Sequence, residues 1–321
     1  MIDLVARRKL FYLVSLLIIL PGAISLVMPG GLRPGIDFTS GTYMTLQFAD
    51  EVEQGKLRQA FEEQNHPEAI VQRAGDRYIV RTAPFVQTQG NVESEEVSPS
   101  ERQAIVAFLQ TRFGSVQVLE LDHVSPQIAA EIVQYSILAV AAACFGILGY
   151  LWFAFRRVPY AYRYGTTAVL ALIHDALVVL GGFSLLGRVF AIELDAMFIT
   201  AVLTVIGFSV HDTIVVFDRI REYAIRHPDD TFEDIVNHSL TQTLARSLNT
   251  SITVLLTLVG LLLFGGVTIR NFVLALLIGI TSGTYSSIFN ASMLLVVWEN
   301  GEIGRLFSGR SRRRQPAFGR A

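Results

Sequence analysis

Six apolar stretches recur along the chain, and each is long enough to cross a lipid bilayer, which takes about 20 helical residues. They cover residues 10–28, 132–154, 165–187, 196–217, 248–266 and 272–298. The first stretch follows a short basic segment, Arg7 to Lys9, as in a signal peptide, but no small-x-small cleavage site closes it. We therefore expect six retained transmembrane helices, the first within residues 1–30 and the other five in a bundle at 128–298.

Residues 31–127 follow a different pattern, that of a small α+β domain. Polar and apolar residues alternate in 42–48, so the apolar side chains from Met44 to Phe48 share one face of a strand. Further strands are expected at 69–73, 76–82 and 115–121, and helices at 51–64 and 99–113. This βαββαβ order is that of the ferredoxin-like split motif. The polar and acidic segment 86–98 is expected to form a mobile loop.

The composition supports a membrane protein. Hydrophobic residues make up 51% of the chain and charged residues 17%, whereas soluble domains average about 25% charged residues. This excess of apolar side chains argues against both a soluble enzyme and a disordered chain. The single cysteine, Cys144, excludes an intramolecular disulfide and a cysteine-based zinc site.

Basic residues are distributed unevenly between the two sides of the predicted bundle. With six spans, 16 of them fall at the chain ends and in the second and fourth connections, and only Arg188 and Arg270 fall in the opposite short loops. Because basic loops stay in the cytoplasm, both termini are predicted to be cytoplasmic, including the basic tail 299–321. The segment 31–125, with 14 acidic and 8 basic side chains, then lies outside.

The connection between the fourth and fifth spans contains an amphipathic helix at 230–245. Asp230 and Glu233 have the spacing of a capping box, and apolar residues follow at helical intervals. We expect this helix to lie on the cytoplasmic face of the membrane or to contact a partner.

Ionisable side chains within the spans are the main candidates for function. His174 and Asp175 lie in the third span, His211 and Asp212 in the fourth, and Arg246 begins the fifth. Charges in hydrocarbon are costly and usually face a bundle interior or a water-filled path. A carboxylate that changes its protonation state near a guanidinium that stays charged would form a proton relay. The alternatives are a fixed Asp212–Arg246 pair, an Arg246 that reaches the membrane surface, and an Asp175 that serves helix packing.

Other classes of function find less support. Ser209 and His211 suggest a membrane serine protease, but two residues apart on a helix they do not face each other. No phosphate-binding loop of the form GxxxxGK[ST] occurs, which argues against ATP as the energy source. The arginine-rich tail is interpreted as a topogenic, lipid-facing segment rather than a nucleic-acid site. A charged cluster ends the fourth span and is expected to form local ion pairs: Asp218, Arg219, Arg221 and Glu222.

Four segments resemble motifs of the SecD/SecF family of protein-export membrane proteins, on its SecF side. They are Gly35–Thr42 (GIDFTSGT), Gly207–Glu222 (GFSVHDTIVVFDRIRE), Arg246–Ser251 (RSLNTS) and Gly283–Phe289 (GTYSSIF). The order of spans and the exported domain also fits. Three positions depart from the family pattern: Ser40 and Ser125 replace glycines, and His211 stands where asparagine is usual.

The resemblance implies an α-helical polytopic membrane protein, an RND-like half-bundle of six transmembrane helices with one exported ferredoxin-like domain. It implies a bacterial inner-membrane subunit that pairs with SecD beside the SecY-E-G channel and pulls emerging preproteins with the proton-motive force. It also assigns Asp212 and Arg246 to the proton pathway, with His211 and Asp175 as secondary candidates. Protons would be the coupling ion, with no metal or organic cofactor and with membrane lipids as surroundings.

The glycines next to the first strand are predicted to form a joint between the first span and the exported domain, because glycine adopts backbone angles that other residues avoid. The motif that would form it consists of Gly35, Asp37, Phe38 and Gly41. Two further functions remain open. One is a proton-driven exporter of small molecules, which would need a large outer cavity. The other is a structural stabiliser of SecD that passes no protons.

Overall fold

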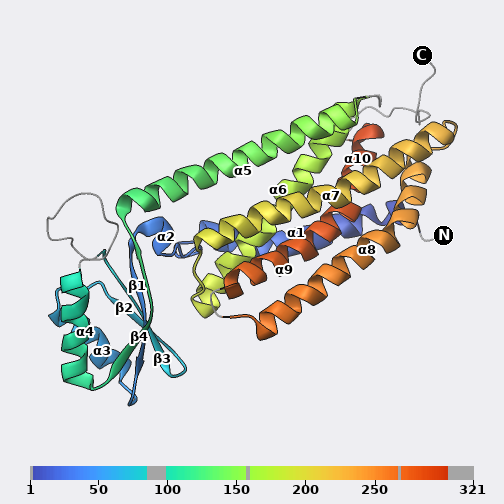
Figure 1. Cartoon of the computed structure of the whole chain (residues 1–321). Coiled ribbons are helices and arrows are strands. Elements are labelled where there is room, and N and C mark those ends of the chain that lie inside the picture. The colour runs from blue at the N-terminus through green and yellow to red at the C-terminus, as the bar shows by residue number, and fades with distance from the viewer. Residues whose placement is uncertain (1–2, 85–98, 157–159, 267–268, 303–321) are drawn as a thin grey trace. The chain divides into compact units, whose positions relative to one another are not determined.

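The computed structural model describes residues 3–84, 99–156, 160–266 and 269–302 and divides the chain into two compact units (Figure 1). One unit contains residues 34–136, and the other combines residues 1–33 with 137–321. The predicted loop 86–98 lies outside the described residues. The exported domain predicted at 31–127 is close to the first of these units, residues 34–136. That unit also includes the first turns of the second span.

Within the described residues, six helices are long and apolar enough to cross a membrane, as the hydrophobic pattern predicts. They are α1 (Arg8–Val27, extended by the short helix η1, Val5–Arg7), α5 (Pro126–Ala154), α6 (Ala161–Phe190), α7 (Ala196–Arg226), α8 (Phe232–Phe264) and the last span, Arg270–Glu299. The last span consists of α9 (Arg270–Tyr285), the π-helical turn η3 (Ser286–Ala291) and α10 (Ser292–Glu299).

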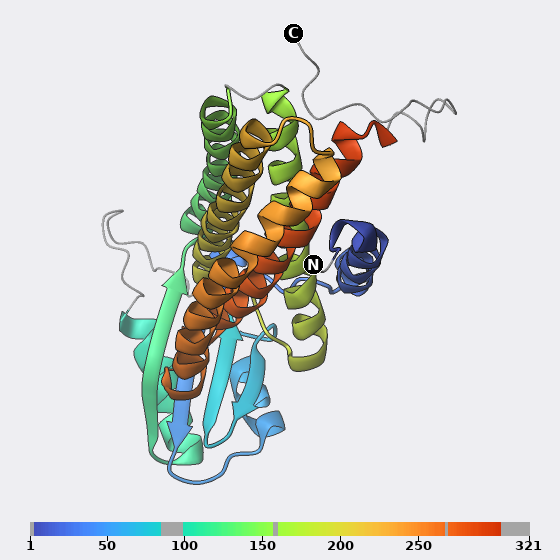
Figure 2. The same ribbon diagram turned by 90° about the vertical axis from the view of Figure 1, so that its right-hand side faces the viewer.

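The helices of the larger unit differ in how much of their surface is covered. In the most apolar stretch of each span, 44% of α6, 50% of α7 and 56% of the last span is buried, against 17% of α1 and α8 and 6% of α5. Helices α6 and α7 and the last span therefore form the centre of the unit. Helix α8 lies beside α9 on one side of this centre (Figure 2).

The predicted amphipathic helix at 230–245 is not a separate element. It forms the first half of α8, which continues without a break into the fifth span. Its first residue is Phe232, two residues later than predicted. The N-cap is Thr231 rather than Asp230, and the hydroxyl of Thr231 accepts a hydrogen bond from the amide of Asp234 at 3.3 Å. Ile235, Val236 and Leu240 are buried, so the amphipathic face packs into the protein.

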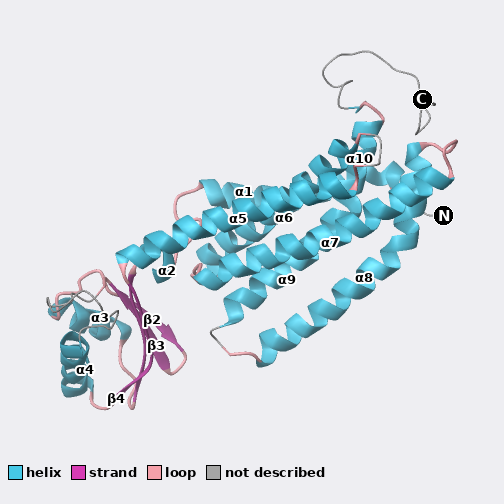
Figure 3. Cartoon of the chain, turned by 45° about the horizontal axis from the view of Figure 1, so that its top comes forward, coloured by secondary structure: helices cyan, strands magenta, loops and turns pink. Residues whose placement is uncertain are grey.

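The smaller unit has the predicted βαββαβ order, with a further short helix α2 (Ile36–Thr39) before it. Its elements are β1 (Gly41–Phe48), α3 (Gln54–Glu63), β2 (Ile70–Ala74), β3 (Arg77–Thr82), α4 (Pro99–Phe113) and β4 (Val116–Val124). The strands form one antiparallel sheet in the order β2-β3-β1-β4, and α3 and α4 cover one face of it (Figure 3). Met44, Leu46 and Phe48 are buried beneath these helices, as the alternation predicts.

Two glycines bring α1 and α6 into close contact. A Cβ atom built on Gly22 would lie 2.7 Å from the Cα atom of Gly181, and the reverse holds for Gly181. Small residues allow membrane helices to approach closely and to gain dispersion energy where no hydrophobic force acts between them. This contact fixes the first span against the centre of the larger unit.

Candidate functional site

Asp175 lies on α6 at the centre of the larger unit and is fully buried. Its Oδ2 atom accepts hydrogen bonds from the hydroxyls of Ser209 on α7, at 2.6 Å, and Ser286 in η3, at 2.7 Å. Its Oδ1 atom accepts one from Ser282 on α9, at 2.9 Å, and lies 3.1 Å from Nδ1 of His174. An ionised carboxylate accepts about four hydrogen bonds. Asp175 therefore has a full set of donors and joins α6, α7 and the last span.

The π-helical turn η3 extends this network toward Asp212. The hydroxyl of Ser287 donates to the backbone carbonyl of Ser209 at 2.9 Å and accepts a hydrogen bond from Thr213 at 2.8 Å. The helices are close enough for this because Gly283 lacks a side chain: its Cβ would lie 3.0 Å from that of Ser209. Such π-helical turns are rare and frequently occur at functional sites.

Asp212 differs from Asp175 in having few partners. It is 3% exposed, and its Oδ2 atom has no hydrogen-bond partner among the described residues. Buried polar atoms in folded proteins are nearly always hydrogen-bonded, so such an atom calls for a functional explanation or for an unseen water or ion. His211, the preceding residue, lies on the exposed side of α7. The predicted position of Asp212, inside the fourth span, is confirmed.

The predicted approach of Arg246 to Asp212 does not occur in this structure. Arg246 lies on an exposed face of α8, and within the described parts of the chain neither residue forms an ion pair. The spacing of Arg246 along α8 explains this, because the buried residues Ser247 and Ser251 direct the other side of the helix toward α9. Exposed polar residues continue at helical intervals on the side of Arg246: Gln242, Asn249, Thr250, Thr253 and Thr257.

The charged cluster at the end of the fourth span forms local ion pairs, as predicted. Arg219 lies 2.5 Å from Glu222, and Arg221 lies 3.7 Å from Asp218. Arg219 also donates from Nε to Gln242 of α8 at 2.6 Å. The cluster thus connects α7 and α8.

No group of three or more His, Cys, Asp or Glu side chains in the described part of the chain is placed to hold a metal ion.

The predicted joint motif lies around α2. Gly35 precedes α2, and its carbonyl accepts hydrogen bonds from the amides of Phe38 and Thr39, both at 3.1 Å. Asp37 lies in the first turn of α2. Gly41 begins β1 with φ of 142°, and a Cβ atom there would lie 2.8 Å from the carbonyl oxygen of Thr82. The sheet itself therefore requires glycine at position 41.

Ser40 has φ of 62° and ψ of 162°, a backbone region that is essentially restricted to glycine. Replacing Ser40 with glycine, the residue usual in the family that the motif resembles, should therefore stabilise the smaller unit. Strain of this kind costs about 1–3 kcal/mol, and the added entropy of an unfolded glycine offsets about 0.5–1 kcal/mol. We expect a net gain of about 1 kcal/mol, measured by urea unfolding of residues 34–125 or by proteolysis of the full chain. A lower stability of Ser40→Gly would contradict this.

The contacts of Arg188 could not be predicted from the sequence, where Arg188 is one of two basic residues in the outer short loops. The Nε atom of Arg188 donates to the hydroxyl of Ser25 at 2.8 Å, and Nη2 donates to the backbone carbonyls of Ser25, Met28 and Pro29 at 2.9, 2.8 and 3.1 Å. It thereby satisfies carbonyls in the last turn of α1 and just after it, which have no partner within the helix. The amide of Leu194 also donates to the carbonyl of Arg33 at 2.8 Å. Residues 25–33 are therefore fixed to α6 and the loop after it.

Comparison with known proteins gives two family matches and close relatives. Residues 104–301 match the family "Protein export membrane protein SecD/SecF, C-terminal", and residues 30–52 match the "SecD/SecF GG Motif". Protein translocase subunit SecF of Thermobaculum terrenum is 53% identical over 96% of this chain and 97% of its own length. The corresponding subunit of Anaerolinea thermophila is 41% identical over 94% of this chain and 96% of its own length.

A solved structure of a SecDF protein is also similar to this chain. The crystal structure of SecDF from Thermus thermophilus, described as a translocon-associated membrane protein, superposes with a TM-score of 0.78 at 32% identity. The match covers 93% of this chain but only 39% of the SecDF chain. This chain therefore spans about two fifths of that longer protein.

Proposed function

The chain belongs to the SecD/SecF family of protein-export membrane proteins, as a SecF subunit of Sec-dependent protein translocation, and from this premise we propose that it couples proton movement to preprotein export. The observation that carries the proposal is Asp212, a carboxylate that is 3% exposed inside a membrane span and whose Oδ2 atom lacks a hydrogen-bond partner among the described residues. A group in this position is stable as a neutral acid and costly as an unpaired anion. When a nearby charge or water reaches such a carboxyl group or leaves it, the group releases or binds a proton.

A partner with its own spans would complete the site. His211 on α7 and Arg246 on α8 are polar residues on faces that this chain leaves exposed, and such residues in spans usually face protein or water rather than lipid. The match to SecDF supports SecD as that partner, since SecDF is a longer chain of which this one matches 39%. SecD would supply further carboxylates, and the assembly would act beside SecY-E-G on emerging preproteins.

In the cycle that we propose, Asp212 alternates between a protonated state and an ionised state that is paired with Arg246. An inward proton gains about 2.3 kcal/mol per 100 mV of membrane potential, which can bias a conformational step over repeated cycles. Residues 25–33 are fixed by Arg188 and Leu194, and the compact units divide at Arg33 and Pro34. We therefore place the joint that passes movement to the exported domain at 34–40, which includes the predicted Gly35.

The proposal is tested with inverted membrane vesicles that contain the native complex and a preprotein arrested partway through the channel. After ATP is removed, imposing a proton gradient should release the preprotein, and an uncoupler should stop the release. Release that persists at the same rate with the uncoupler would contradict proton coupling. It would then favour a subunit that only stabilises SecD.

The orientation follows from the asymmetry of basic residues, with both termini in the cytoplasm of the inner membrane and the smaller unit outside. It is tested with single cysteines in a Cys144→Ala background, at Arg58, whose side chain is 61% exposed, and at the exposed Asp229. In intact spheroplasts an impermeant maleimide should label Arg58→Cys and leave Asp229→Cys unlabelled. The opposite result would invert the topology and remove the basis for inward proton flow.

A further inference from the structure

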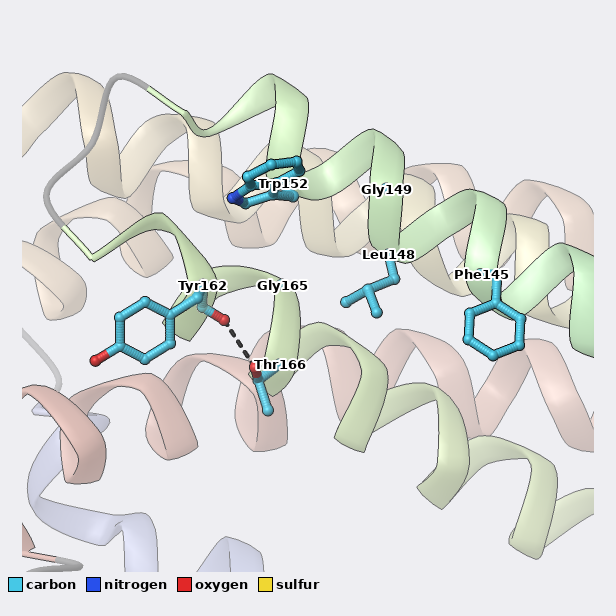
Figure 4. Close-up of a pocket in the computed structure, with 7 residues that line it drawn as sticks. All are labelled: Phe145, Leu148, Gly149, Trp152, Tyr162, Gly165 and Thr166. Carbon is cyan, nitrogen blue, oxygen red and sulfur yellow. Dashed lines mark hydrogen bonds between the residues drawn. The ribbon is translucent and has the colours of Figure 1, made fainter.

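A groove of about 450 Å³ lies between α5 and α6 within the larger unit (Figure 4). Phe145, Leu148 and Trp152 line it from α5, and Tyr162 and Thr166 line it from α6. The volume falls in the range of about 300–1,000 Å³ that is typical of small-ligand sites. The walls are largely apolar, and the hydroxyl of Thr166 is occupied because it donates to the carbonyl of Tyr162 at 2.7 Å. The groove therefore suits a hydrocarbon chain better than a polar ligand.

Two glycines keep the groove open. Gly149 on α5 has no heavy atom within 4 Å of the position where a Cβ atom would be, and a Cβ atom on Gly165 of α6 would meet only Leu148, at 3.6 Å. Larger side chains at these positions would project into the groove without straining the backbone. The groove lies next to α5, the span with the least buried surface, 6% of its most apolar stretch.

The end of the groove at the α5–α6 connection is positively charged. Arg156 lies one turn beyond Trp152, its guanidinium is stacked on Phe153 at 4.3 Å, and it has no carboxylate partner among the described residues. Arg163 lies nearby but is neutralised by Glu299 at 2.7 Å. The N-terminus of α6 adds a partial positive charge, since no side chain of the described residues caps its first amides. An apolar groove with one cationic end matches an anionic amphiphile.

We propose that this groove binds an anionic phospholipid, with one acyl chain between α5 and α6 and the phosphate near Arg156 and the first amides of α6. Trp152 lies two residues before the end of α5, and Tyr162 is the second residue of α6. Aromatic side chains near the ends of spans typically meet lipid headgroups. Basic pockets between transmembrane helices are a known means of binding anionic headgroups. The bound lipid would fill the space beside α5 and hold this sparsely packed helix against α6.

The test uses the fluorescence of Trp152 in the full chain, purified in mild detergent. The chain has two tryptophans, so a Trp298→Phe background leaves Trp152 as the only reporter. Titration with phosphatidylglycerol or phosphatidylcholine, each with brominated acyl chains, measures how closely each lipid approaches Trp152. We expect phosphatidylglycerol to quench at roughly fivefold lower concentration, the factor that corresponds to about 1 kcal/mol for one arginine near anionic lipid.

Two matched pairs of variants separate the headgroup from the chain. Arg156→Gln should remove the preference for phosphatidylglycerol, whereas Arg7→Gln, at an exposed arginine of η1 that forms no ion pair among the described residues, should retain it. Gly149→Leu should weaken quenching by both lipids, whereas Gly260→Leu, at a glycine of α8 with equally open surroundings, should not. Equal quenching by the two lipids in the parent chain would overturn the proposal. So would loss of quenching when SecD is bound, because the groove would then belong to the protein interface.

Discussion

Replacing Asp212 with asparagine is expected to abolish proton-driven export while leaving the complex at its normal level in the membrane. Asparagine has almost the same shape as aspartate, but it cannot bind or release a proton at any physiological pH. Because Oδ2 of Asp212 has no hydrogen-bond partner among the described residues, the substitution breaks no hydrogen bond at that atom. Export should fall at least about 100-fold, the low end of what a positioned acid–base group contributes to a reaction. The measurement is preprotein release from energised vesicles after ATP is removed.

Arg246→Met should have a similar effect, because it removes the cation that the ionised Asp212 would need. Asp218→Asn is the matched control. Asp218 lies six residues further along the same helix, its side chain is 67% exposed, and it lies 3.7 Å from Arg221. Exposed pairs of this kind contribute about 0–1 kcal/mol, so release should remain close to that of the parent complex. Parent rates in Asp212→Asn vesicles would contradict the proton relay and leave Asp212 as a buried structural carboxylate.

The sequence was sufficient to predict the secondary structure because hydrophobic periodicity reports on the environment of each segment. Six predominantly apolar stretches of this length are expected to be helices in a bilayer, where backbone amides have no other partner. Alternation in residues 42–48 likewise identified the buried face of β1. Boundaries were less certain: the cap at Thr231 and the continuity of α8 depend on local hydrogen bonds and packing, and periodicity does not report on either.

Contacts between distant segments could not be predicted in this way. Ser282 and Ser286 are 107 and 111 residues from Asp175, and only the packing of the last span against α6 brings them to its carboxylate. Arg188 could be recognised as basic, but its acceptors on α1 are about 160 residues away. Asp212 and Arg246 were identified because each is costly in a span, and their separation in this structure reflects the helix faces on which they lie.

The partners of Asp175 lead to a different prediction from that for Asp212. If Asp175 carried protons, Asp175→Asn would leave the fold intact and stop export. The structure instead gives its carboxylate two donors on each oxygen, from Ser209 and Ser286 on one and from Ser282 and His174 on the other. These contacts hold the carboxylate in one position between α6, α7 and the last span.

The main expected effect of Asp175→Asn is therefore a lower stability of the larger unit, and not a direct loss of proton transfer. The amide nitrogen of asparagine donates rather than accepts, so the two side chains that donate to the oxygen it replaces would lose residue 175 as their acceptor. Each buried donor left unsatisfied costs about 1–3 kcal/mol, which gives a loss of about 2–6 kcal/mol. The measurement is the thermal unfolding midpoint of the detergent-solubilised chain, followed by fluorescence-detected size exclusion. Thr257→Val is a suitable control, since its exposed hydroxyl donates only within its own helix, to Thr253 at 3.1 Å. If Asp175→Asn kept the parent unfolding midpoint but lost export, Asp175 would belong to the proton pathway with Asp212.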